Sequence, residues 1–140
     1  MHRIAAGLHH SLCTDQNGNL VAFGRGDYGQ LGITRQRPEG DYFEPRPVRV
    51  ALDEEDDSEV VQISCGGNHN LAITSKGSVY SWGFGSEYAL GHGFNKDEYR
   101  PKKLALMRGN MSGEWPIGLR VHQVAAGGQH SAMLCERKAE

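Results

Sequence analysis

Short stretches of alternating apolar and polar residues, bounded by glycine, make up much of this chain. Between Ser11 and Thr14 the alternation places Leu12 and Thr14 on one side. The same alternation recurs twice further along, at Leu71 and Ile73 and at Ala132 and Leu134. A period of two is typical of a half-buried strand, and no segment carries a sustained apolar stripe of helical period. The pattern predicts an all-β protein of about ten strands, with no helix longer than about two turns.

Each of the first two alternating segments is followed by a tight turn and a second predicted strand. The turns are Asp15–Gly18 and Thr74–Gly77, and the glycine in each supplies the positive φ that a hairpin turn needs. The next segments, Asn19–Phe23 and Ser78–Trp82, are rich in branched and aromatic residues, which favour strands. A β-hairpin is therefore predicted in each half of the chain.

Glycine and proline mark where these hairpins end and where outer strands begin. Gly24 and Gly83 are expected to end the second strand of each hairpin. Proline-rich stretches precede two further predicted strands, Val48–Ala51 and Lys102–Leu106. The longer variable stretches are predicted surface loops, at residues 33–44, 53–59, 92–100 and 107–119.

One sequence motif occurs three times in the chain. Ile4–Ser11 returns 59 residues later as Ile63–Asn70, which returns 61 residues later as Val124–Ser131. A fixed period of this kind predicts a repeat architecture, and two hairpins per period suit a four-stranded blade of a β-propeller. The expected fold is about two and a half blades of four-stranded antiparallel sheet, which form one partial propeller over residues 1–140. Its repeat units are 1–59, 60–119 and 120–140.

Five glycines occupy equivalent places in these units and are interpreted as structural. Gly7, Gly66 and Gly127 close triplets of small residues, which fit where inner strands crowd together, and Gly24 and Gly83 follow the hairpins. A repeat array needs about three or more units to bury a continuous core. We therefore expect the chain to be part of a longer array. Alone, it should be weakly stable, oligomeric or prone to aggregate.

Composition argues against several classes of function. The chain has 15 basic and 17 acidic residues and a formal charge of -2, which gives no general attraction to nucleic acid or to an anionic membrane. No apolar run approaches the roughly 18 residues of a membrane span, and the N-terminal residues do not resemble a signal peptide. The 3 cysteines cannot all pair with one another, which favours a reduced intracellular compartment.

Two motifs are similar to signatures of ligand binding or catalysis but are interpreted otherwise. The spacing of Cys65 and His69 would suit zinc or a nucleophile pair, but structural zinc needs about four converging ligands and no third residue orients such a pair. Gly24–Gly29 matches a dinucleotide-binding loop, yet no helix is predicted after it to hold a pyrophosphate. No catalytic residue, metal, cofactor or small-molecule substrate is therefore predicted.

Four stretches, read together, resemble the regulator of chromosome condensation repeat family. They are Gly7–Cys13 with its double histidine, Gly24–Gly32, Trp82–Gly93 and Gly127–Leu134. The likeness covers about the whole chain. In the order of its repeats and its charged tail, the chain is most similar to the C-terminal third of the family's founding member. The resemblance implies a seven-bladed parent propeller.

The resemblance also implies a function. The family's founding activity is guanine-nucleotide exchange on the small GTPase Ran, carried out on chromatin in the nucleus and without bond-making chemistry. This chain would be a C-terminal fragment that contributes part of the GTPase-binding face. Histones or chromatin would be bound through parts outside it. The alternatives are a propeller-repeat interaction scaffold unrelated to Ran, since a fold does not determine a function, and a hydrolase that uses the cysteine and histidine positions.

His10, His69 and His130 occupy equivalent positions and are the candidate partner-binding residues. The resemblance implies that histidines of this loop lie on the face that binds Ran. The alternative is that each ring bonds a backbone group and stabilises its turn, which is favoured for His69 and left open for the other two. Near them, Arg25 and Asp27 either contact a partner or form local ion pairs.

The acidic run Asp53–Asp57 has two interpretations. A run of like charges is usually a solvated loop, which is the interpretation favoured here. A contact with a basic partner is the alternative.

Overall fold

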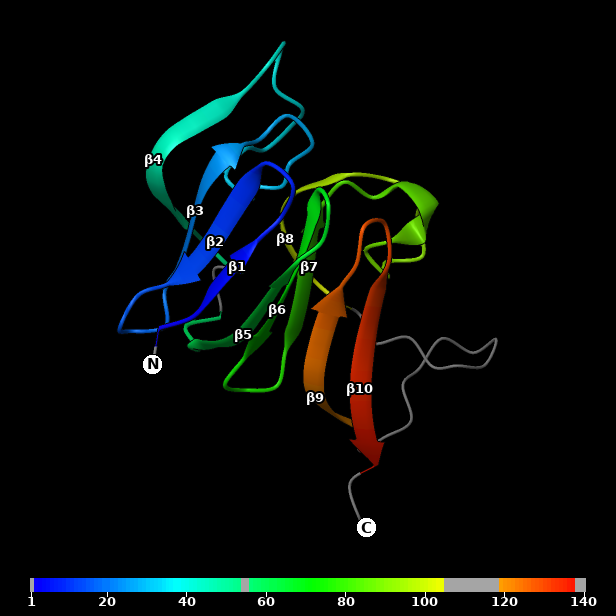
Figure 1. Cartoon of the computed structure of the whole chain (residues 1–140). Helices are drawn as coiled ribbons and strands as arrows, with labels where there is room; N and C mark the ends of the chain where they lie inside the picture. The colour runs from blue at the N-terminus through cyan, green and yellow to red at the C-terminus, as the bar shows by residue number, and fades with distance from the viewer. Residues whose placement is uncertain (1, 54–55, 105–118, 138–140) are drawn as a thin grey trace.

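The computed structural model describes residues 2–53, 56–104 and 119–137. Over these ranges the chain forms ten β-strands and one short 3₁₀ turn, η1 at Ser86–Tyr88, arranged in three antiparallel sheets (Figure 1). The predicted all-β class and blade-like sheets are confirmed. Among the described residues there is no helix with the length and apolar character needed to cross a membrane.

The first two sheets each contain four strands in chain order, which is the arrangement of a propeller blade. Blade 1 consists of β1 (Ile4–Ala6), β2 (His10–Thr14), β3 (Leu20–Arg25) and β4 (Phe43–Val50). Blade 2 consists of β5 (Val60–Cys65), β6 (His69–Thr74), β7 (Val79–Gly83) and β8 (Glu98–Lys103). Every strand pairs only with its neighbours in sequence, so each blade is a simple meander.

The third sheet is half a blade, formed by β9 (Leu119–Ala126) and β10 (Ser131–Arg137). Its register repeats that of the preceding blade: Ser131 lies opposite Ala126, as Asn70 lies opposite Cys65. The three sheets stand side by side in chain order, from blue through green to red (Figure 1). We refer to β9 and β10 as half-blade 3.

Several strand boundaries differ from the sequence prediction. Gly24 does not end its strand, because its φ of 107° accompanies a register shift after which β3 continues to pair with β4. The outer strands β4 and β8 begin earlier than predicted and contain Pro45, Pro47 and Pro101. Both are edge strands, where a residue without an N–H leaves no ladder bond unmade. The predicted loop at residues 107–119 lies almost entirely outside the described residues.

The apolar core lies between the blades. One cluster joins Leu12 of blade 1 to Ala72 and Trp82 of blade 2, and a second joins Leu71 to Val124 of half-blade 3. All six residues of β6 are buried, although the sequence predicted a half-buried strand. The reason is that neighbouring sheets cover both of its faces. Burial of a large apolar side chain of this kind contributes about 1.5–3 kcal/mol.

The antiparallel order places the connections at two opposite ends of the sheets. The connections β1–β2, β3–β4, β5–β6, β7–β8 and β9–β10 lie at one end, which we call the loop end. The hairpins β2–β3 and β6–β7 lie at the other, which we call the turn end. Gly18 and Gly77 in these two hairpins have φ of 77° and 83°, as the sequence predicted.

Candidate partner-binding site at the loop end

A hydrogen-bonded bridge joins blade 1 to blade 2 at the loop end. His10 Nε2 lies 2.7 Å from Asn70 Oδ1, and Asn70 Nδ2 donates to the carbonyl oxygen of Gln30 at 2.6 Å. Because a carbonyl only accepts, the amide group of Asn70 faces Gln30 and its oxygen faces His10. His10 Nε2 is therefore the donor. His10 and Asn70 are 3% and 0% exposed.

The same bridge recurs between blade 2 and half-blade 3 with different chemistry. His69 Nε2 lies 3.0 Å from Ser131 Oγ and 3.1 Å from the carbonyl oxygen of His130. Ser131 Oγ donates to the carbonyl oxygen of Ala89 at 2.7 Å, and Ala89 is the repeat equivalent of Gln30. The hydroxyl therefore accepts from His69, so this ring also carries its proton on Nε2.

The repeat glycines make room for these rings. A Cβ at Gly7 would lie 2.2 Å from the ring of His10, and the same distance separates Gly66 from His69 and Gly127 from His130. At Gly7 and Gly66 an added Cβ would also lie 2.7 Å and 2.3 Å from a backbone carbonyl oxygen, so these two positions require glycine. At Gly127 it would meet only the exposed side chain of His130. The interpretation of Gly7 and Gly66 as structural therefore has a direct physical reason.

The three predicted partner-binding histidines are in two different environments. His10 and His69 are buried between blades, whereas His130 is exposed. The alternative role offered by the sequence was a bond to a backbone group that stabilises the turn. His69 does lie within bonding distance of a backbone carbonyl oxygen, but His10 bonds the Asn70 side chain, and both bonds cross to the next blade. Burial lowers the pKa of His10 and of His69, so both rings are neutral at pH 7. Contact between these histidines and a GTPase stays a prediction.

A cluster of charged and aromatic side chains lies beside the bridge. Arg25 and Asp27 form an ion pair at 2.6 Å, and the Arg25 guanidinium lies 5.6 Å from the centre of the Tyr28 ring. Tyr28 in turn makes an edge contact with Phe84 of blade 2, with ring centres 5.1 Å apart. The hydrogen bond from Arg25 lowers the pKa of Asp27. Sequence reasoning did not connect Tyr28 with Phe84, because the contact joins two blades.

Tyr88 is an exposed aromatic residue in an unusual backbone conformation. Glu87 and Tyr88 have φ of 59° and 58°, and Tyr88 is 63% exposed. The repeat equivalent of Tyr88 is Gly29, which has φ of 79°. A side chain in this region costs about 1–3 kcal/mol, and such strain is concentrated at functional sites. In the sequence, this exposed and strained aromatic residue was signalled only by the replacement of the repeat glycine at position 88 by tyrosine. Leu8, 68% exposed, lies at the same end.

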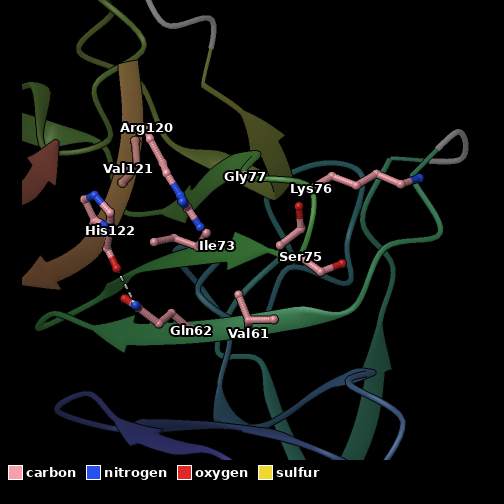
Figure 2. A pocket seen from close by; sticks show the side chains of 10 residues that line it. Val61, Gln62, Ile73, Ser75, Lys76, Gly77, Arg120, Val121 and His122 are labelled. Atoms are coloured by element: carbon pink, nitrogen blue, oxygen red, sulfur yellow. Dashed lines mark hydrogen bonds between the residues drawn. The ribbon is translucent and has the colours of Figure 1, made fainter. Parts of the chain in front are cut away.

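The turn end holds a groove between blade 2 and half-blade 3. It has a volume of about 540 Å³, and Arg120 extends along it toward Ile73 (Figure 2). Gln62 Nε2 donates to the carbonyl oxygen of His122 at 2.6 Å and joins the two blades on one side. The residues lining the groove include no carboxylate or cysteine. The groove is therefore interpreted as a seam between blades.

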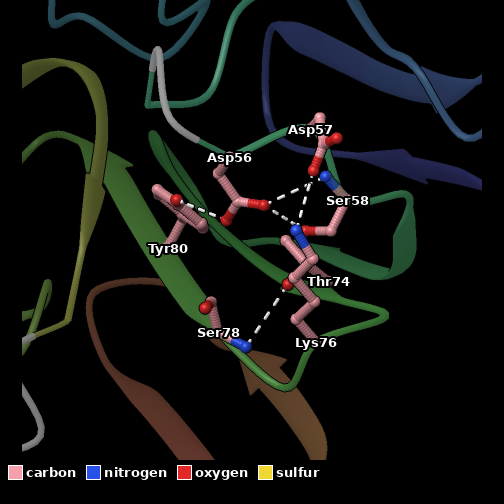
Figure 3. A network of polar contacts seen from close by, with 7 residues as sticks. All are labelled: Asp56, Asp57, Ser58, Thr74, Lys76, Ser78 and Tyr80. Carbon is pink, nitrogen blue, oxygen red and sulfur yellow. Dashed lines mark hydrogen bonds and ion pairs between the residues drawn. The ribbon is translucent and has the colours of Figure 1, made fainter.

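The described part of the acidic run is held in a polar network at the turn end (Figure 3). Tyr80 donates its hydroxyl proton to Asp56 at 2.7 Å, Ser58 also bonds Asp56, and Lys76 pairs with Asp57 at 2.7 Å. Burial raises the pKa of Asp56, but the bonds from Ser58 and Tyr80 outweigh it and lower the pKa overall. Asp56 therefore anchors this loop to β7.

Cys65 and His69 lie at the two ends of the β5–β6 connection, within the ranges that the structure describes. Within those ranges no three His, Cys, Asp or Glu side chains converge as metal ligands. Burial raises the pKa of the Cys65 thiol to about 12, so it is protonated at neutral pH and is a poor nucleophile. These observations disfavour the Cys65–His69 interpretations.

The sheets and their strand order define a protein built from β-propeller repeats, with exposed apolar and aromatic side chains at the loop end. The model of the regulator of chromosome condensation (RCC1) repeat matches residues 17–73 and 76–134, and a second model of this repeat matches residues 2–30 and 60–88. The chain belongs to the RCC1 repeat family, which confirms the resemblance seen in the sequence.

Three relatives illustrate the range of proteins that share these repeats. The chain is 29% identical to human Regulator of chromosome condensation over 97% of its own length and 29% of that protein. It is 36% identical to mouse Protein RCC2, over 74% of this chain and 23% of that protein. It is 34% identical to the Ultraviolet-B receptor UVR8 of Arabidopsis thaliana, over 91% of this chain and 26% of that protein. The chain thus spans less than a third of these relatives.

Solved structures agree with this assignment. The whole chain superposes on 32% of Prp20p from Saccharomyces cerevisiae with a TM-score of 0.77 and 28% identity, and that protein is described with binding properties to Gsp1p and histones. Human WBSCR16 shares the fold at a TM-score of 0.71 and 23% identity, over 96% of this chain and 31% of that one.

Proposed function

We propose that this chain is part of a guanine-nucleotide exchange factor for the small GTPase Ran. In this proposal the loop end forms part of the GTPase-binding face, and the parent protein acts by binding, on chromatin in the nucleus. The observation that carries the proposal is the superposition of the whole chain on Prp20p, which is described with binding properties to Gsp1p and histones. The repeat match to human Regulator of chromosome condensation supports it.

The physical character of the loop end suits this role. An exchange factor works only if it binds the nucleotide-free GTPase more tightly than the loaded one. Loops that are already held in place lose less conformational entropy on binding. Buried bonds from His10 and His69 hold these loops between blades, while Leu8 and Tyr88 remain exposed for contact.

The test is a binding measurement with the purified chain and Ran. Nucleotide-free Ran, prepared with EDTA, and Ran loaded with GTP and Mg²⁺ are compared by biolayer interferometry. We expect tighter binding to nucleotide-free Ran, and a loss of about 5- to 30-fold with Tyr88→Ala or Leu8→Ser, as for a contact worth about 1–2 kcal/mol.

The matched control is Lys76→Ala, an exposed change at the turn end. It should leave the affinity unchanged, and circular dichroism should show the same fold for all variants. Equal affinity for empty and loaded Ran, or equal effects of Tyr88→Ala and Lys76→Ala, would contradict the proposal.

The second candidate is a propeller-repeat scaffold unrelated to Ran. The observation in its favour is that identity is higher to Protein RCC2 and to the receptor UVR8 than to human Regulator of chromosome condensation. A folded chain that fails to bind Ran in either nucleotide state would support this candidate.

A further inference from the structure

A second groove lies at the loop end, between the β3–β4 connection of blade 1 and the beginning of β8 in blade 2 (Figure 1). Its volume is about 410 Å³, within the range of about 300–1,000 Å³ that is usual for ligand sites. Arg35 and Arg37 line it from the connection, and Lys96, Tyr99 and Arg100 line it from the opposite side. Basic side chains from two blades therefore meet in one groove.

Close backbone contacts hold the two walls of this groove together. Gly29 and Gly32 lie in the β3–β4 connection and pack against β8. A Cβ at Gly29 would lie 2.7 Å from the carbonyl oxygen of Glu98, and one at Gly32 would lie 3.1 Å from Cδ of Pro101. Because the walls are already in contact, a ligand would order little new backbone when it binds.

The two carboxylates that line the groove already have partners. Asp97 Oδ1 accepts a hydrogen bond from the N–H of Gly85 at 2.8 Å. Glu98 Oε1 lies 3.3 Å from Lys102 Nζ and 3.9 Å from Lys96 Nζ. Neither carboxylate is therefore needed to neutralise the arginines.

The arginines of the groove are exposed and available to a ligand. Arg35, Arg37 and Arg100 are all exposed, and none of them forms an ion pair with a carboxylate of the described residues. Burial raises the pKa of Tyr99, so the ring that lines the same groove stays neutral and adds no negative charge. The groove therefore offers three guanidinium groups without an anion.

The charge of the groove differs in sign from that of the chain. Its lining has four cationic and two anionic side chains, a local formal charge of +2, whereas the whole chain has a charge of -2. A guanidinium group presents paired N–H donors that match the oxygens of a phosphoryl group. A phosphorylated serine or threonine carries a charge of about -1.5 to -2 at pH 7. One such group would therefore balance the lining.

We propose that this groove binds a phosphorylated serine or threonine of a partner polypeptide, with Arg37 and Arg100 holding the phosphoryl oxygens from opposite walls. A polypeptide is favoured over nucleic acid because the local charge matches one phosphoryl group, while the charge of the whole chain would repel a string of phosphates. Leu8 and Tyr88 do not line the groove. The site is therefore separate from the contacts proposed for Ran and does not depend on them.

The test is an array of short peptides with random flanking residues, probed with the full chain. Each peptide is synthesised in three matched forms, with phosphoserine, serine or glutamate at its centre. The strongest phosphoserine binder is then titrated by fluorescence anisotropy. We expect its serine and glutamate forms to bind at least about tenfold more weakly, because charge-assisted paired bonds to a phosphoryl group are lost.

Two variants remove one arginine from each wall. Arg37→Gln and Arg100→Gln should each weaken the phosphoserine peptide about 10- to 100-fold, as for a lost hydrogen bond to a charged group. Both residues are exposed, so circular dichroism should show an unchanged fold. Arg46→Gln is the matched control, because Arg46 is an exposed arginine of β4 that does not line the groove. It should leave the affinity unchanged, and so should Tyr88→Ala.

A parallel titration with duplex DNA separates the proposal from general phosphate binding. DNA should bind more weakly than the phosphoserine peptide, and Arg37→Gln should not change its affinity selectively. The proposal is overturned if no phosphoserine peptide binds in preference to its serine and glutamate forms, or if Arg46→Gln weakens binding as much as Arg37→Gln and Arg100→Gln. Tighter binding of DNA that the same two variants weaken would assign the groove to nucleic acid instead.

Discussion

His10 donates a hydrogen bond to Asn70, 60 residues further along the chain, across the boundary between two blades. Both side chains are buried, and Asn70 in turn donates a hydrogen bond to the backbone carbonyl oxygen of Gln30. The bond between His69 and Ser131 repeats this relationship one blade later. The repeated histidine therefore joins each blade to the next, and the Asn or Ser that receives its bond completes the bridge.

The first prediction concerns the energy of this bridge. His10→Ala and Asn70→Ala should each lower the free energy of unfolding by about 1–3 kcal/mol, because each leaves a buried polar partner unpaired. The double variant should cost less than the sum, with a coupling energy of about 0.5–3 kcal/mol. Urea denaturation followed by circular dichroism measures all three. His130→Ala, at an exposed site, should stay within about 0.5 kcal/mol of the wild type, and equal losses at positions 10 and 130 would contradict the bridge.

The second prediction concerns pH. Burial lowers the pKa of His10 and His69 in the folded chain, whereas the unfolded chain titrates near about 6.5. As the pH falls below about 6.5, the unfolded state takes up protons first, so stability that is present at neutral pH is lost. The slope is at most about 1.4 kcal/mol per pH unit for each histidine. Denaturation midpoints across the range from about pH 5 to pH 7 measure this slope.

The control for this prediction is His69→Gln, which keeps a side-chain donor and does not titrate. Its stability should depend less steeply on pH over the same range. Carboxylates such as Asp27, whose pKa is lowered, titrate at more acidic pH and do not interfere. An unchanged slope would show that His69 does not contribute to the pH dependence.

The third prediction compares two equivalent loops. Gly66→Ala would place a Cβ 2.3 Å from the carbonyl oxygen of Gly127 and 2.2 Å from the ring of His69. It should lower stability by about 1–3 kcal/mol or prevent folding. Gly128→Ala meets nothing within 4 Å and should be tolerated in the monomer. Thermal unfolding of both variants at low concentration tests this, and similar melting temperatures would contradict it.

The fourth prediction concerns the strained loop at η1. Tyr88→Gly removes a side chain from a φ of 58° and should raise the free energy of unfolding by about 1 kcal/mol. If Tyr88 contacts a partner, the same change should weaken the binding of nucleotide-free Ran to the chain. Higher stability together with lower affinity is the expected pair of results, from denaturation and from biolayer interferometry. A variant less stable than the wild type would show that the backbone is not strained there.

The sequence by itself determined the features that depend on local chemistry. The spacing of equivalent residues predicted a repeat, the alternation around Leu12 predicted strands, and the turn glycines Gly18 and Gly77 were placed correctly at positive φ. The strands and turns depend on residues close together in the chain, and the repeat follows from the recurrence of such local patterns 59 and 61 residues apart. Family membership followed from the same local patterns.

Tertiary structure alone decided which faces are buried and which residues meet. Alternation predicted that β6 is half-buried, yet sheets on both sides bury all of it. Leu134, the repeat equivalent of Ile73 in β6, is largely exposed. His10 and His130 occupy equivalent positions in the repeat, but only His10 lies in a blade that a further described blade follows. Contacts between blades join residues about 60 positions apart, the length of one repeat. The physical reason is that burial depends on which sheet packs beside a strand, and the local pattern of a repeat is the same whether that neighbour is present or absent.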